Sequence, residues 1–201
     1  MTLSVNTYTM NYSNVVNLSF EDKLRATRLA GYSTLSLMPA DIQSMEQSGR
    51  TLADIRSQAA DHGVRIDRMD PLNTWSRRWV SDNMPDSYTL KTATTAHEFF
   101  RICEGLGCTH ASLNAMFPLN SMSHEEITED FITTCKYGAD HGVNIDLEFV
   151  PLWGLPSLEM AWKVVRDADQ PNGLLCYDIW HHAVSYTHLR AHETDSYLVC
   201  R

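Results

Sequence analysis

One unit recurs five times along this 201-residue chain: a stretch with helical periodicity, then a glycine, then a short apolar run. The joints read AGYSTLSLM, HGVRIDRMD, LGCTHASLNA, HGVNIDLEFV and NGLLCYDIW. Glycine at each joint suits a helix C-cap, where the backbone enters the left-handed region. The short apolar runs that follow are typical of buried parallel strands. The recurrence therefore predicts strands that alternate with helices.

The expected helices begin at residues that cap helix N-termini, namely Ser19, Thr51, Ser123 and Ser157. If LSVNTYT at 3–9 forms the first strand, the chain has six strands and five intervening helices. Such alternation with right-handed crossovers gives a parallel sheet, either an open doubly wound sheet or a (β/α)8 barrel.

Polar residues end several of the expected strands, and this pattern favours the barrel. Asp70, Asn114, Glu148 and Asp178 each stand where an apolar run stops. Functional groups spread over many strand ends are typical of TIM barrels. The first strand is followed by neither GxGxxG nor GxxxxGK, so no nucleotide-binding loop is indicated. We expect an α/β fold of the (β/α)8 TIM-barrel type that is incomplete, with about six βα strands.

Composition excludes several classes of protein. The formal net charge of −9 argues against a nucleic-acid-binding surface, which needs a basic footprint. No run of 18 apolar residues predicts a membrane span, and the N-terminus lacks the pattern of a secretory signal. The cysteines contain no CxxC pair, so we expect reduced thiols and a cytoplasmic protein.

The C-terminal segment 183–201, AVSYTHLRAHETDSYLVCR, breaks the repeating pattern. It resembles the translated read-through of a sequencing adapter. We therefore expect residues 1–182 to form a partial barrel and residues 183–201 to be a non-native or disordered tail. A natural polar extension is the alternative. His188 and His192 are then unrelated to the chemistry that Asp178 and His181 indicate.

Glu148 and Asp178 are the main candidate metal ligands. Each stands at the end of a strand that is otherwise apolar, where an unpaired carboxylate is costly to bury. Neighbouring strands lie about 4.8 Å apart, so two carboxylates on adjacent strand ends can share one divalent ion. The alternative is that each carboxylate pairs with an arginine or caps a helix.

These residues resemble a known superfamily. A Glu ending strand five, Asp178-x-x-His181 ending strand six, and MDPLNTW after strand three are similar to the xylose-isomerase-like barrels, which include sugar isomerases, epimerases and inosose dehydratases. The resemblance implies that Glu148 and Asp178 bind a divalent metal (Mn, Mg, Co or Zn), that Glu148 is also the catalytic base, and that His181 contacts substrate oxygens. The superfamily's other ligands, a His after strand seven and a Glu after strand eight, have no counterpart here.

The function implied by the resemblance is isomerisation or epimerisation of a sugar or polyol through an enediolate. We expect this chain to be an inactive fragment of such an enzyme, which belongs to carbohydrate metabolism and could be a homo-oligomer at full length. The alternative from another class is a non-catalytic sugar-binding or interaction module. A dehydratase is less favoured. A metal-dependent nuclease is disfavoured because the ends of strands three and four lack His.

Four further residues are candidate substrate contacts. Trp75 and Arg77 lie in the expected loop after strand three, where a lid over the sugar would form. The alternative for this loop is a solvated basic turn with packed tryptophans. Trp153 follows Glu148 closely and Asn114 ends strand four. All four would lie near the carboxyl ends of the strands.

Overall fold

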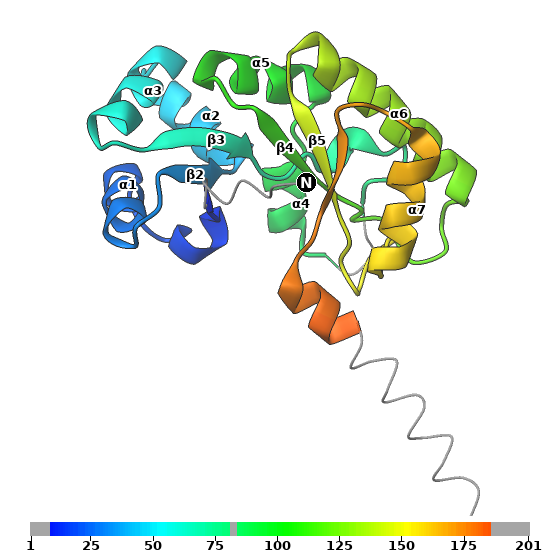
Figure 1. Ribbon diagram of the computed structural model, residues 1–201. Coiled ribbons are helices and arrows are strands. Elements are labelled where there is room, and N and C mark those ends of the chain that lie inside the picture. Colours follow the sequence, from blue (N-terminus) through cyan, green and yellow to red (C-terminus); the bar gives the residue numbers. More distant parts are fainter. Residues whose placement is uncertain (1–8, 81–83, 186–201) are drawn as a thin grey trace, which may run out of the picture.

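The computed structural model describes residues 9–80 and 84–185. Six parallel strands form one sheet in chain order, each hydrogen-bonded to the next. They are β1 (Thr9–Met10), β2 (Thr34–Leu37), β3 (Arg65–Met69), β4 (His110–Asn114), β5 (Asn144–Glu148) and β6 (Gly173–Cys176). Figure 1 shows the sheet curving as a half-barrel. The expected incomplete TIM-barrel fold with six strands is confirmed. Most of the stretch expected as the first strand, residues 3–8, lies outside the described residues.

Most helices cover the outer side of this sheet, whereas the short helix Asp86–Thr92 lies at the carboxyl ends of the strands, where Tyr88 is hydrogen-bonded to Tyr12. The helices are α1 (Phe20–Leu29), α2 (Pro39–Gln47), α3 (Leu52–Asp61), α4 (Asp86–Thr92), α5 (Ala96–Leu106), α6 (His124–Asp140) and α7 (Leu158–Ala168), with 3₁₀ turns η1 (Tyr12–Val15) and η2 (Asn73–Trp75). In Figure 1, α3, α5, α6 and α7 follow one another along the outer rim.

The expected N-caps are all present. The side chains of Ser19, Thr51, Ser123 and Ser157 each accept a hydrogen bond from a backbone N–H of the first helical turn. Helices α2 and α4 were not predicted. Neither has a side-chain cap, and α2 instead begins with proline at its first position. The other helix starts were predicted from a capping side chain, and the sequence offers no such residue at the start of α2 or α4.

Four of the five glycine joints behave as expected. Gly31, Gly63, Gly107 and Gly142 have positive φ angles between 66° and 84°. The expectation for the fifth joint is wrong, because Gly173 lies inside β6 and Asp169, with φ 46°, ends α7 in the left-handed region. A Cβ at position 173 would lie 3.1 Å from the Phe131 ring, so that glycine serves close packing of β6 on α6.

The outer faces of the strands carry the hydrophobic core. Leu35, Leu37, Leu113, Ile145 and Leu147 are completely buried, and alternation along the strands directs them to the helices. No helix in residues 9–80 and 84–185 is both long and apolar enough to cross a membrane. The cysteines in the same ranges are free thiols.

The inner face of the sheet is polar, whereas branched apolar side chains usually fill a TIM barrel. Arg68 Nη2 lies 2.9 Å from Asp146 Oδ2, and Arg68 Nη1 donates to Ser112 Oγ at 3.1 Å. His110 Nδ1 is 2.9 Å from the same Asp146 oxygen. These side chains from β3, β4 and β5 form a hydrogen-bonded floor below the carboxyl ends of the strands.

The boundary expected at residue 182 falls within a helical segment, residues 179–185. Figure 1 places this segment just beyond β6. Residues 186–201, which make up most of the expected tail, lie outside the described part of the chain. The status of the tail therefore remains a prediction.

Candidate metal and substrate site

Three potential metal ligands converge where β5 and β6 end. Glu148, Asp178 and His181 each offer one ligand atom, and these atoms all lie within 4.8 Å of one another. All three side chains are partly buried. The structure thus brings together the two acids and the histidine that the sequence indicated.

Glu148 is held by the sheet on both sides. It is the last residue of β5 and pairs in register with Asn114 of β4 and Cys176 of β6. Asp178 is positioned differently, because its Oδ1 accepts the backbone N–H of His181 at 2.8 Å. This contact caps the helical segment 179–185 and fixes the Asp-x-x-His spacing as one local unit.

The surroundings of Glu148 disfavour its charged form. Burial raises the pKa of its carboxyl to about 8, and the negative charges of Asp70 and Asp178 act in the same direction. Arg68 opposes the shift. Without a cation, Glu148 is therefore largely protonated at neutral pH.

His181 lies next to Glu148, within the distance at which a protonated imidazole would pair with the carboxylate. Its Nε2 is 3.7 Å from Glu148 Oε1, too far for a hydrogen bond. Burial lowers the pKa of the His181 imidazole, and the charge of Asp178 opposes this shift. His181 Nδ1 is buried and has no partner among the described residues.

This donor set fits a divalent cation. Two carboxylate oxygens and one imidazole nitrogen suit Mn, Mg, Co or Zn, and the set does not select one of them. A bound ion would offset the repulsion among the three acids Glu148, Asp178 and Asp70, which lie close together here. It would therefore favour the ionised form of Glu148.

A second group of residues, which the sequence did not single out as site residues, lies beside this set. Asp70 directly follows β3, is buried, and accepts a hydrogen bond from Asn11 Nδ2 at 3.1 Å. Burial raises the pKa of Asp70 to about 6. Tyr12 and Tyr88 are hydrogen-bonded to each other, and burial, with a smaller contribution from the charge of Asp70, raises the pKa of both. Only the strand-end position of Asp70 signalled this group in the sequence.

Both groups line one hollow at the carboxyl ends of the strands, which we call the strand-end cavity. It consists of two adjoining cavities of about 360 and 560 Å³ that share Asn11, Asp70, Glu148 and Asp178. Arg68 lines the first part, and Asn114 and His181 line the second. The volume suits a small polar ligand.

Three of the predicted substrate contacts do not line this cavity. Trp75 is buried in the core, where its indole N–H donates to the backbone oxygen of Asn114 at 2.9 Å. Arg77 binds Asp130 of α6 on the surface, with 2.9 Å between Nε and Oδ1. Trp153 is half-buried in the loop after β5. The predicted contact that does line the strand-end cavity in addition to His181 is Asn114.

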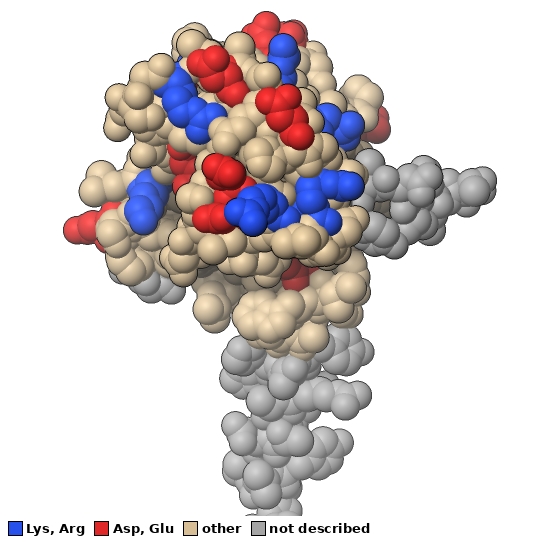
Figure 2. Space-filling view, turned by 90° about the vertical axis from the view of Figure 1, so that its left-hand side faces the viewer, with Lys and Arg blue, Asp and Glu red and all other residues tan. Residues whose placement is uncertain are grey.

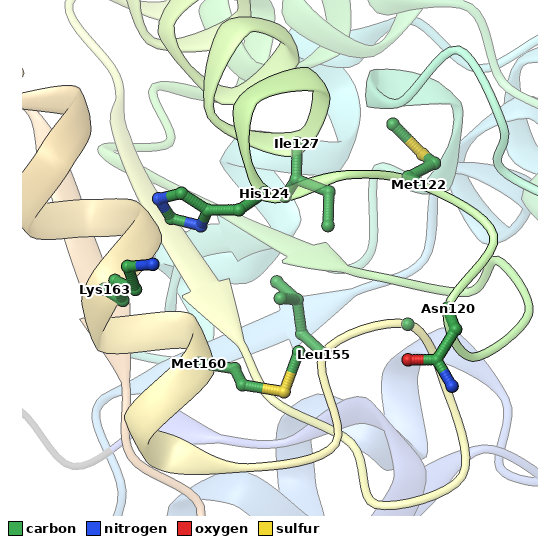
Figure 3. Close-up of a pocket in the computed structure, with 8 residues that line it drawn as sticks. Asn120, Met122, His124, Ile127, Leu155, Met160 and Lys163 are labelled. Carbon is green, nitrogen blue, oxygen red and sulfur yellow. The ribbon is translucent and has the colours of Figure 1, made fainter.

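A separate cavity of about 160 Å³ lies between α6 and α7. Figure 3 shows His124 of α6 and Lys163 of α7 on one side, with Met160, Leu155 and Met122 closing it. His124 Nε2 already contacts Asp167 at 2.9 Å. This small cavity contains none of the converging ligands.

The parallel sheet, its outer helices and a cavity at the carboxyl ends of the strands define an α/β protein of the TIM-barrel class with a candidate metal centre. More particularly, the chain belongs to the xylose isomerase-like TIM barrel family, whose model matches residues 24–197. No curated protein matches the sequence significantly.

Solved structures share this fold at low sequence identity. A xylose isomerase domain containing protein from Salmonella typhimurium LT2 is 17% identical with a TM-score of 0.69, over 93% of this chain and 65% of that protein. The IOLI protein with a binding zinc atom is 19% identical, with a TM-score of 0.67, over 86% of this chain and 63% of that protein. D-psicose 3-epimerase in the presence of D-fructose is 16% identical, with a TM-score of 0.62, over 87% of this chain and 64% of that protein. This chain thus spans less than two thirds of the length of each.

Proposed function

We propose that this chain carries the strand-five and strand-six part of the active site of a divalent-metal-dependent sugar isomerase or epimerase. The observation that carries the proposal is the convergence of ligand atoms from Glu148, Asp178 and His181 within 4.8 Å. Two structural neighbours support it, since one was solved with zinc and another is an epimerase solved with a sugar.

Glu148 and Asp178 would hold the ion, with His181 beside them. When bound, the ion supplies Lewis-acid polarisation of the substrate carbonyl. His181 is placed to contact a substrate oxygen, because its buried Nδ1 has no partner in the part of the chain that the structure describes. Asn114, paired in register with Glu148, lies next to the same point.

Glu148 is the proposed base. In its ionised form it takes the proton from the carbon next to the carbonyl, and the electron pair of that C–H bond moves to form the enediolate. Return of a proton to the opposite face of the same carbon gives the epimer, and return to the former carbonyl carbon gives the isomer. For the epimer, the returning proton must come from a second acid on the opposite face of the substrate, because Glu148 reaches one face only.

The first test is metal binding by the chain itself. Calorimetric titration of the metal-free protein with MnCl₂ should show one site. Glu148→Ala should weaken Mn²⁺ binding by at least about 100-fold, because the variant lacks one of the residues that directly bind the metal. Glu159→Ala, which changes an exposed acid on α7, is the matched control and should bind as wild type. Equal binding by all three proteins would refute the metal site.

The second test separates a catalytic site from a sugar-binding module on the same scaffold. The Mn-loaded chain is incubated with D-fructose in D₂O, and deuterium on carbon is measured by mass spectrometry. Exchange that depends on Glu148 indicates proton abstraction. Sugar binding without exchange indicates a module or a fragment whose remaining catalytic groups lie elsewhere in the whole protein.

A further inference from the structure

One wall of the strand-end cavity has no role in the proposed proton transfer. It comprises Asp70 after β3, Asn11 before η1 and the side chain of Asn114 at the end of β4. Asn11 is fixed at both ends of its amide, since Oδ1 accepts the N–H of Ser13 at 2.9 Å and Nδ2 donates to Asp70 at 3.1 Å. Asp70 is therefore held in place in the cavity.

This wall presents hydrogen-bond acceptors. Asn114 is only 9% exposed, and its Oδ1 is buried with no partner among the described residues. The Asp70 carboxylate accepts hydrogen bonds and donates none when ionised. A buried acceptor without a hydrogen bond is unfavourable, so a ligand that donates a hydrogen bond to it binds more tightly.

The cations near the wall are already engaged. Arg68 is the one Arg or Lys among the described residues that line the strand-end cavity, and Asp146 and Ser112 bind its guanidinium. Arg77, expected from the sequence to contact the substrate, is paired with Asp130 on the surface. Figure 2 shows such pairing more widely on one face, where basic and acidic side chains lie side by side.

We propose that Asp70, together with Asn114, is a specificity determinant that selects an uncharged polyhydroxylated substrate and rejects the same sugar when it carries a phosphate. Hydroxyl groups can donate to both acceptors. A phosphate dianion that lies against this wall, away from the ion, has no proton to donate and is repelled by Asp70. This assignment depends on the proposed function for the position at which the sugar binds, but it does not depend on the proposed proton transfer.

The test compares two sugars that differ by one group. The chain, both loaded with Mn²⁺ and metal-free, is titrated calorimetrically at pH 8 with D-fructose and with D-fructose 6-phosphate, so that binding of the phosphate to the ion is separated from its rejection at Asp70. Wild type should bind fructose at least about 10-fold more tightly than the phosphate. Asp70→Asn keeps the shape but removes the charge, so it should narrow this ratio at least about fivefold, mainly by tighter binding of the phosphate.

Asp67→Asn is the matched control. Asp67 is a buried acid on the opposite face of β3, where it contacts Thr109 Oγ1 at 2.9 Å, and it does not line the strand-end cavity. Its substitution should leave the ratio unchanged. Asn114→Leu provides a second variant, and it should weaken fructose binding at least about fivefold while Mn²⁺ binding stays as in wild type.

The outcomes are distinguishable from failure of the proposed function. Loss of the Glu148-dependent Mn²⁺ site refutes that function, and the sugar ratio is then measured on the metal-free chain. Equal binding of both sugars, binding of neither, or an unchanged ratio in Asp70→Asn overturns the specificity assignment even if the metal binds as expected.

Discussion

Glu148 and Asp178 offer ligand atoms to one point, but they stand on parts of the sheet with unequal support. β5 is an interior strand, with five registered pairs to β4 and four to β6. β6 has β5 as its neighbour in the described sheet, and beyond it Tyr177, Ile179 and Trp180 are 51%, 75% and 67% exposed. Half of the candidate site is thus built on a buried scaffold and half on an edge with uncovered apolar side chains.

Convergence of the ligands and rigidity of the ligands are therefore separate properties of this site. The capping contact of Asp178 orders the segment 179–185 locally, whereas Glu148 is ordered by the whole sheet. Metal affinity depends on both halves being held at once. The edge strand β6 therefore limits how well the site is preorganised.

The largest effect should come from truncating the core under each half. Leu147 of β5 is completely buried, whereas Leu175 of β6 is only partly buried. Leu147→Ala should lower the free energy of unfolding by about 3–4 kcal/mol and Leu175→Ala by about 1–2 kcal/mol, because the cost grows with the cavity left behind. Urea unfolding followed by circular dichroism measures both.

Equal losses in the two variants would show that β6 is supported as firmly as β5, and would remove the contrast. A broad, non-cooperative transition of the wild type would show instead that the edge loosens the whole domain, as six strands that do not close a barrel predict.

The second effect concerns pH. Burial, Asp70 and Asp178 raise the pKa of Glu148 to about 8, so the folded, metal-free chain keeps a proton that the unfolded chain has already lost. The folded state therefore binds more protons between about pH 5 and pH 8, and the free energy of unfolding should fall as pH rises through this range. Each unit of pKa difference is worth about 1.4 kcal/mol, so a decrease of a few kcal/mol is expected.

Unfolding in EDTA at a series of pH values measures this dependence. In Glu148→Gln, the free energy of unfolding should change little with pH over this range. Asp178→Asn should shift the dependence to lower pH, because one of the charges that raises the pKa of Glu148 is removed. A dependence that survives in Glu148→Gln would assign the proton to another group, with Asp70 and its pKa of about 6 the next candidate.

Much of this contrast was visible in the sequence. The glycine joints and N-caps located β2 to β6, and the strand-end acids Glu148 and Asp178 were recognisable because apolar runs stop at them. The cavity wall at Asp70 was not assigned, since its proximity to Asn11 depends on how residues 59 positions apart meet in space.

Side-chain direction was also beyond the sequence. Trp75 was expected over the sugar, yet it packs edge-on against Phe117 and Phe131 with ring centroids 6.3 and 6.4 Å away. A tryptophan after a strand has the same local pattern whether it faces the core or a ligand. Only tertiary packing distinguishes the two, and the same holds for Arg77 and its partner Asp130.

The smallest effect on folding, and the most direct measure of the uncovered edge, should come from its exposed tryptophans. Trp162 on α7 and Trp180 are 52% and 67% exposed, and Trp162 lines an apolar hollow with Leu158, Leu175 and Tyr177. Apolar surface of this kind favours association. We expect the wild type to self-associate, and the double variant Trp162→Glu, Trp180→Glu to shift it toward monomer with a change in unfolding free energy below about 1 kcal/mol.

Sedimentation velocity over a range of concentrations measures this shift. Leu29→Glu is the matched control, because Leu29 on α1 is 87% exposed but lies away from the β6 edge. If the control reduces association as much as the double variant, general surface polarity explains the result. If the wild type is monomeric and melts sharply, the exposed apolar side chains beside β6 do not drive association. The two halves of the candidate site are then equally well supported.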